Sequence, residues 1–258
     1  MGAVYLGLDR EQPELTKTAA TLLNAVLGWE SAKRLAVGAP HRDGQPKTVW
    51  QSGDARVDIV LPYYASQVRA RLEGGEEPNP SSVVLRLVRG NTAILVGGDA
   101  PLGSWERLEP ELLPARLIRA PHHGGRIDEG RVTWTEDTLY ERVGAATVVV
   151  SVGTHNGHEH PTDDHLRAIR VDRRRLLCTQ LTPRCHADPA ALRPGLRTRL
   201  AGGVLPYRHL HPSRQEVPCA GSVVAWLEPG DALEVEPAPG GPHDAFVAAV
   251  DHPRCRAT

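Results

Sequence analysis

The chain has 258 residues, of which 40% are hydrophobic and only 4% aromatic, and its formal net charge is −1. This length fits one large domain, or a domain with an extension, and the near-neutral charge excludes a global basic field that would attract nucleic acid. No apolar run approaches the roughly 18 residues that span a bilayer, and the first residues lack a signal-peptide pattern. We therefore expect a cytoplasmic protein with no membrane partner.

The first part of the chain predicts a strand, a helix and a second strand. The first strand covers residues 4–6. Apolar residues at helical spacing predict a helix over residues 9–27 that covers a sheet. Alternating apolar residues predict a strand over residues 57–61, which ends at Pro62.

Two strands over residues 82–88 and 92–96 follow, and the short Gly-containing turn between them is typical of a hairpin. Ser104 is expected to cap a short helix beyond them. Residues 147–152 are β-branched at nearly every position, which predicts a strand buried on both faces. Thr162 is expected to cap the next helix, with two aspartates in its first turn.

Within that helix, Leu166 and Ile169 are expected to face the sheet, and His165 is placed on the helix surface, as His155 is before it. Residues 175–181 predict a returning strand. Residues 222–227 and 232–235 predict a second hairpin near the C-terminal end.

Three short polar signatures each follow an apolar run that predicts a buried strand. Polar groups and glycines at strand ends are a common way for a rigid sheet to present metal ligands or catalytic groups. The signatures are Gly97-Gly98-Asp99-Ala100, Pro121-His122-His123-Gly124-Gly125 and Asn156-Gly157-His158-Glu159-His160-Pro161.

The order of these signatures resembles that in the metallo-β-lactamase fold hydrolases, and most closely the soluble domain of ComEC-type competence proteins. The resemblance covers roughly residues 57–179. The family's first metal motif, His-x-His-x-Asp-His, has no counterpart in this sequence. The resemblance therefore implies an α/β fold that is an N-terminally incomplete αββα sandwich. It assigns residues 1–182 to a partial metallo-β-lactamase-like domain and residues 183–258 to a C-terminal extension packed on it.

The resemblance also implies a metal-dependent hydrolase of the phosphodiesterase or nuclease type, with two Zn²⁺ or Mn²⁺ ions in a complete site. Asp99 corresponds to the carboxylate that bridges the metals, and one of the adjacent His122 and His123 faces them. We assign His123 to the metal and His122 with His158 to catalysis. The missing ligands would come from upstream sequence or another chain.

Substrate contacts are assigned to Gly124, Gly125 and His160, with the glycines letting a phosphodiester approach the backbone N–H groups. His160 can instead be structural, since it precedes a helix. The expected partners are a nucleic acid or phosphodiester substrate, and a homodimer mate or other protein that covers the incomplete sheet.

Two alternatives stay open at this point. The chain can be a non-catalytic remnant that serves as a scaffold or partner-binding module, with Asp99 an ordinary turn residue and the His pair solvated. The cysteines offer either a structural zinc site or buried thiols. The candidate zinc ligands are Cys178, Cys185, Cys219 and Cys255, with His186 as a substitute for the last.

Overall fold

The computed structural model describes residues 2–5, 35–38, 46–61, 82–127, 132–171, 174–189, 191–192, 217–248, 250 and 253. Its largest element is a seven-stranded mixed sheet with the order β3-β4-β5-β6-β7-β8-β9. Pairing is antiparallel from β3 to β6 and parallel from β6 to β9. The strands are β3 (Lys47–Ser52), β4 (Ala55–Leu61), β5 (Val84–Arg89), β6 (Thr92–Val96), β7 (Leu117–Arg119), β8 (Thr147–Val150) and β9 (Arg175–Cys178).

Two further pairs of strands are described. β1 (Gly2–Tyr5) pairs in parallel with β2 (Leu35–Gly38). β10 (Val224–Leu227) and β11 (Leu233–Glu236) form an antiparallel hairpin. The helices are α3 (Leu102–Trp105), α4 (Glu136–Val143), α5 (Asp163–Arg170) and α7 (Pro242–Ala248), with short 3₁₀ helices η2 (Pro110–Leu112) and η3 (Pro121–Gly124).

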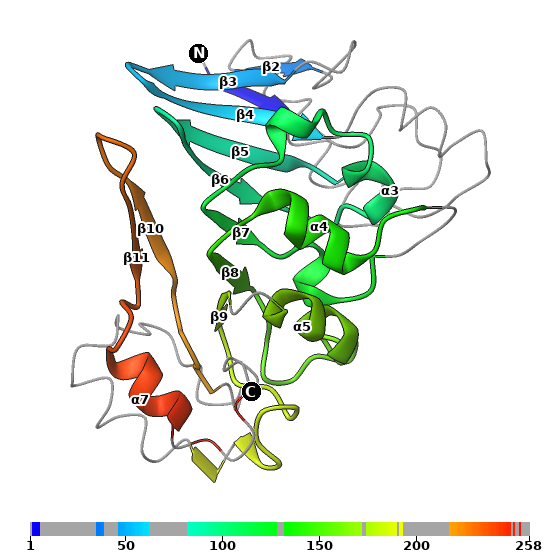
Figure 1. Cartoon of the computed structure of the whole chain (residues 1–258), viewed down its shortest axis with the longest axis vertical. Helices are drawn as coiled ribbons and strands as arrows, with labels where there is room; N and C mark the ends of the chain where they lie inside the picture. The colour runs from blue at the N-terminus through cyan, green and yellow to red at the C-terminus, as the bar shows by residue number, and fades with distance from the viewer. Residues whose placement is uncertain are drawn as a thin grey trace.

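Helices α3, α4 and α5 cover one face of the sheet (Figure 1). Side chains alternate along each strand, so Ile118 and Val148 point to this face and are fully buried there. They pack in one apolar cluster with Trp105, Leu139 and Ile169 from the helices. Burying whole side chains of this size stabilises the fold by about 1.5–3 kcal/mol each.

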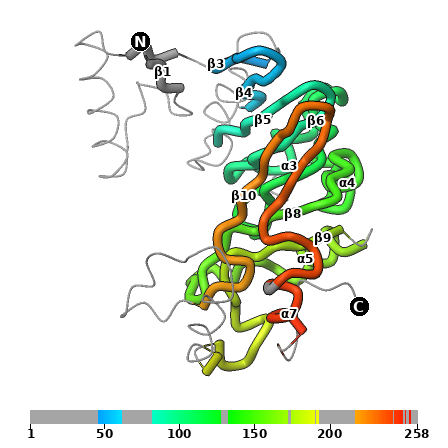
Figure 2. Tube along the Cα trace, turned by 90° about the vertical axis from the view of Figure 1, so that its left-hand side faces the viewer, coloured from blue at the N-terminus to red at the C-terminus, as the bar shows by residue number. Residues whose placement is uncertain are grey.

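The other face of the central strands is covered by the chain's own β10–β11 hairpin. Leu117 and Val149 point to this face and belong to a second apolar cluster, against which Leu227 and Val235 of the hairpin pack. Figure 2 shows the hairpin running along the sheet with its tip beside β5 and β6. An incomplete sandwich was expected to leave an edge or a face of the sheet exposed. Over β6–β9 this second face is instead covered by a segment of the same chain.

The tip of this hairpin is fastened to the turn between β5 and β6. Asp231 accepts hydrogen bonds from Asn91 N at 2.6 Å and Asn91 Nδ2 at 3.1 Å, and its carbonyl accepts one from Thr92 Oγ1 at 2.8 Å. Gly90 has a φ of 55°, which favours glycine, and a side chain there would also meet Asp231 Oδ1. Asp231 therefore acts as a latch between two distant hairpins.

Replacing Asp231 by Gly should lower the free energy of unfolding by about 1–3 kcal/mol, because two polar contacts of the latch are lost. Glycine tolerates the φ of 65° at this position, so the substitution removes the side chain without adding backbone strain. Urea unfolding measures the change. Glu234→Ala is the control, since it removes one exposed carboxylate from the same hairpin. If both variants lowered the free energy of unfolding equally, the hydrogen bonds of Asp231 would not be what holds the hairpin in place.

Most of the expected elements are confirmed. The hairpin of β5 and β6, the buried strand β8 and the C-terminal hairpin all form. Thr162 caps α5 by accepting from His165 N, with Asp163 and Asp164 in the first turn. The strand expected over 175–181 ends at Cys178, and the helix expected over 9–27 lies outside the described residues.

The cap expected from Ser104 is wrong. Helix α3 begins after Pro101 and has no side-chain cap, and Ser104 is buried inside it. Pro101 provides an extended residue before the first turn, which starts the helix three residues earlier than a Ser104 cap would. In the described part of the chain, every helix is too short or too polar to cross a bilayer.

Candidate functional site

The candidate site lies where the four parallel strands β6 to β9 end. Their carboxyl ends meet at one edge of the sheet, which is where ligands bind in open α/β sheets. The loops that follow carry Asp99, the His122-His123 pair, Ser151 and Thr179. The fold thus brings all three polar signatures to the same edge.

The His pair has an unusual backbone. His122 (φ 49°, ψ 37°) and His123 (φ 56°, ψ 24°) are both left-handed, although neither is glycine. Each such residue costs of order 1–3 kcal/mol and persists only when its surroundings hold it. Here His122 N donates to Gly98 O at 2.9 Å, and Gly125 N donates to His122 O at 2.7 Å. Strain kept in this way is frequent at functional sites.

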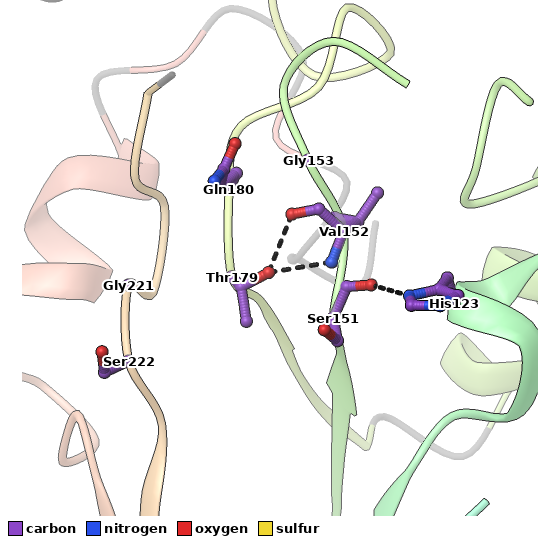
Figure 3. Close-up of a pocket in the computed structure, with 8 residues that line it drawn as sticks. All are labelled: His123, Ser151, Val152, Gly153, Thr179, Gln180, Gly221 and Ser222. Atoms are coloured by element: carbon purple, nitrogen blue, oxygen red, sulfur yellow. Dashed lines mark hydrogen bonds between the residues drawn. The ribbon is translucent and has the colours of Figure 1, made fainter. Parts of the chain in front are cut away.

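His123 is held in one tautomer. Its Nδ1 lies 2.5 Å from the carbonyl oxygen of Ser151, which only accepts, so Nδ1 carries the proton (Figure 3). The other nitrogen, Nε2, lies 3.7 Å from Asp99 Oδ1, and both side chains are about two-fifths exposed (42% and 41%). A histidine whose Nδ1–H is fixed by a carbonyl and whose Nε2 faces a carboxylate is arranged like a metal ligand.

The other three histidines of the signatures form a row of rings. His122 Nδ1 lies 2.8 Å from Arg126 O, so its Nε2 is also the unprotonated nitrogen when the ring is neutral. The His122 ring meets His160 edge-on at 5.1 Å, and His160 stacks on His158 at 5.7 Å. Burial lowers the pKa of His160, and the neighbouring histidines lower it further while Asp99 opposes them.

The loop that carries His158 is held by residues that sequence reasoning missed. Asn156 Oδ1 accepts from His160 N at 2.7 Å, and Asn156 Nδ2 donates to the carbonyls of Gly153 and His160, both at 3.0 Å. Arg184 donates to Glu159 O at 3.2 Å and to Asp163 Oδ2 at 2.8 Å. These bonds stabilise the turn in which Glu159 is left-handed (φ 57°).

Arg119 was also missed, although it lies beside the expected metal ligands. Its Nη1 donates to Gly98 O at 3.2 Å, and its Nη2 lies 3.4 Å from His123 Nδ1. Burial lowers the pKa of Arg119, and the charge of Asp99 partly restores it. The signal in the sequence was a charged residue closing an otherwise apolar strand directly before the His pair.

The glycines after the His pair have a packing role. A side chain on Gly125 would collide with the His160 ring and meet His122 O at 2.8 Å, and one on Gly124 would meet Pro161 Cβ at 2.8 Å. The N–H of Gly125 is already bonded to His122 O. Gly125 therefore serves the close packing of two loops, and its N–H is not directed at a substrate.

The surface placement of His165 is wrong. The residue is fully buried, with Nδ1 donating to Gly125 O at 2.9 Å and Nε2 accepting from Tyr140 Oη at 2.5 Å. Burial lowers the pKa of His165 to about 4, so the ring is neutral at pH 7. Burial also raises the pKa of Tyr140 well above its ordinary value. His165 thus stabilises the Gly125 turn through its buried hydrogen bond to Gly125 O. His155 is exposed, as expected.

The candidate zinc cysteines do not converge in the described residues. Cys178 lies in the main core, whereas Cys185 and Cys219 lie in a separate apolar cluster with Phe246. Cys219 Sγ lies 3.6 Å from His243 Nε2. Cys255 is outside the described residues, and the substitute ligand His186 accepts from Asp188 N through Nδ1.

The described residues supply only part of a metal centre. Among the described residues, no three His, Cys, Asp or Glu side chains come together as a group that could hold a metal ion. Asp99 and His123 supply two donors, fewer than the three protein ligands of a catalytic zinc site. The described residues therefore do not fit a two-metal centre by themselves.

Zn²⁺ and Mn²⁺ should accordingly bind weakly to this chain, with less than about one equivalent kept after dialysis, because two donors compete poorly with water. Elemental analysis of dialysed protein measures this. Asp99→Ala should lower metal uptake further, and Asp137→Ala, which removes an exposed helical carboxylate, should not. Two equivalents retained by the chain and lost on Asp99→Ala would show that its ligand set is complete.

An open cleft of about 410 Å³ adjoins His123. Figure 3 shows Gly221 and Ser222 on one side of it and Ser151 with Thr179 on the other. The Thr179 hydroxyl donates to Val152 O and accepts from Val152 N, both at 2.8 Å, which fixes the wall after β8. Val152, Gly153 and Gln180 complete the described lining.

A scan with protein-family models gives no match to this chain, and no curated protein matches it. The likeness of the three signatures to the metallo-β-lactamase family therefore stays a prediction. Support for a function has to come from the arrangement of the side chains at the sheet edge.

Proposed function

We propose that the chain is a metallo-β-lactamase-type hydrolase that acts on phosphodiesters, with an incomplete metal site among its described residues. The observation that carries this proposal is the facing pair of Asp99 Oδ1 and His123 Nε2, 3.7 Å apart. The Ser151 carbonyl fixes the tautomer of His123, and the Arg119 guanidinium adds a positive charge beside the pair. Carboxylate, imidazole and guanidinium together suit a phosphoryl group better than a neutral ester.

The roles of the chain's own residues follow from this geometry. Arg119 binds and orients the phosphoryl oxygens, and the phosphoryl group reacts beside Asp99 and His123. His122 and His158 contact the ring of His160, which lies close enough to Asp99 and His123 to feel their charges, and we assign to them the transfer of a proton to the leaving oxygen. Further metal ligands, from elsewhere in the chain or from a partner, complete the centre.

The fold is consistent with one half of an αββα sandwich. Helices α3, α4 and α5 form the outer layer, the seven-stranded sheet forms the next, and the β10–β11 hairpin lies where a second sheet would pack. On this proposal the C-terminal segment stabilises a sheet that in the family is covered by a longer first lobe.

A non-catalytic partner-binding module is the second candidate. The observation in its favour is that the described residues supply no group of three metal donors. Trp50 on the edge strand β3 is 52% exposed, and an exposed edge can pair with another chain. This candidate predicts a protein partner or homodimer in place of turnover.

Hydrolysis of bis(4-nitrophenyl) phosphate in excess Mn²⁺ or Zn²⁺ separates the two candidates. The hydrolase proposal expects metal-dependent release of nitrophenol that falls at least about 100-fold in Asp99→Ala. Asp137→Ala, with the same change of charge on an exposed helix, should keep its activity. Absence of hydrolysis at every metal concentration, or full activity in Asp99→Ala, would favour the binding module.

A further inference from the structure

The proposed function does not say which groups the phosphodiester joins, and the cleft beside His123 indicates one of them. We infer that this cleft binds the polyol or sugar side of a small phosphodiester whose phosphoryl group is held by Arg119. This inference rests on the proposed function and sharpens it, because it selects a compact, hydroxyl-rich substrate over a nucleic-acid strand.

The first step is the phosphoryl position. Because His123 Nδ1 carries a proton for Ser151 O, it cannot also accept one from Arg119 Nη2, 3.4 Å away. Arg119 Nη1 already donates to Gly98 O. The Nη2 end therefore keeps N–H groups for a ligand, at a point next to Asp99 and His123. A guanidinium in this position matches two oxygens of a phosphoryl group.

The second step is the chemistry of the cleft. Ser151 and Ser222 line it. The Gly153 carbonyl is bonded to Asn156 Nδ2 and the Gly221 N–H to Thr179 O, so the backbone groups left for a ligand are the Gly153 N–H and the Gly221 carbonyl. Hydroxyls and backbone groups recognise other hydroxyls by paired hydrogen bonds. At about 410 Å³ the space lies near the small end of ligand sites. A glycerol or single-sugar group fits these properties.

The third step is the discrimination against nucleic acid. Proteins bind single strands with aromatic platforms for the bases and several Lys or Arg side chains for successive phosphates. Among the described residues that line the cleft, only His123 has a ring and none is Lys or Arg. The net charge of −1 adds no general attraction for a polyanion.

Calorimetric titration of the full chain with three probes tests the inference. The probes are inorganic phosphate, the phosphodiester of two glycerols, and a thymidine dinucleotide. Arg119→Gln should weaken phosphate and the glycerol diester about tenfold or more, since both need the guanidinium. Ser222→Tyr, at an exposed position, should fill the cleft and weaken only the glycerol diester by a similar factor.

Two controls match these variants. Arg116→Gln makes the same change of charge at the opposite end of β7, and Ser52→Tyr adds the same ring at the end of β3; neither should change binding. Amide shifts of Gly153 and Gly221 in the unmodified chain, on adding the glycerol diester, test the cleft without any substitution. The expected result includes weaker binding of the dinucleotide than of the glycerol diester.

The outcomes distinguish this inference from the proposed function. Phosphate binding that depends on Arg119, together with tighter binding of the dinucleotide or unmoved Gly153 and Gly221 amides, would overturn the inference alone. Phosphate binding that is absent, or equal in Arg119→Gln, would overturn the proposed function and the inference with it.

Discussion

Replacing His165 by Ala should lower the free energy of unfolding by about 3 kcal/mol or more. The substitution leaves a cavity in a fully buried position and removes the partners of Tyr140 Oη and Gly125 O. Urea unfolding measures the loss. His155→Ala, at an exposed position of the preceding loop, is the control and should change stability by less than about 0.5 kcal/mol. Similar results for both variants would place His165 on the surface after all.

His165 should also make stability depend on pH. Its pKa is lowered from 6.5 to about 4 in the folded chain, chiefly by burial, with His160 and His122 adding to the effect and the bond to Gly125 opposing it. The unfolded chain therefore binds more protons between these values. The contribution is fully present above pH 6.5 and is lost as pH falls toward 4, by about 3 kcal/mol in total.

The variant His165→Gln isolates this effect, because glutamine can donate to Gly125 O and accept from Tyr140 Oη but does not titrate. Unfolding free energies of both proteins are measured from pH 4 to pH 7. Because only histidine titrates, the stability of the histidine protein relative to the glutamine variant should rise by about 3 kcal/mol from pH 4 to pH 7. Parallel curves would rule out a buried neutral histidine.

Gly125→Ala should both destabilise the chain and displace the site. The new methyl group would collide with the His160 ring and lie 2.8 Å from the backbone oxygen of His122. Overpacking of this kind costs about 1–3 kcal/mol. Thermal unfolding and the His160 ring signals in NMR spectra report the two effects.

Gly157→Ala is the matched control, since nothing lies within 4 Å of a side chain there, and it belongs to the same group of loops. It should leave stability and the His160 signals nearly unchanged. If Gly125→Ala instead weakened phosphodiester binding with no loss of stability, the glycine would serve the approach of substrate, as the sequence alone suggested.

Local patterns predicted much of the sheet. The β-branched run of β8 and the short turn between β5 and β6 needed no distant contact to be recognised. The three polar signatures were expected to share a site, and the parallel order of β6 to β9 places their loops at one edge. Strand ends are informative because neighbouring parallel strands bring them together whatever the loops contain.

Contacts between distant segments could not be predicted in this way. Asp231 and Asn91 are 140 residues apart in sequence, and they form a hydrogen bond only because the two hairpins that carry them pack against each other. Arg119 and Asn156 act through partners that only the folded loops supply. His165 was misplaced because a polar residue was assumed to face solvent, although its spacing of four from Ile169 put it on the apolar stripe.

Diffraction from a crystal grown with Mn²⁺ and inorganic phosphate tests the central proposal most directly. An anomalous difference map locates the cation, and the phosphate density shows how the oxyanion is held. The proposal predicts a cation bonded to Asp99 Oδ1 and His123 Nε2, with phosphate beside it in contact with Arg119. A cation bound away from this pair, or phosphate bound elsewhere while the sheet edge stays as described, would contradict it.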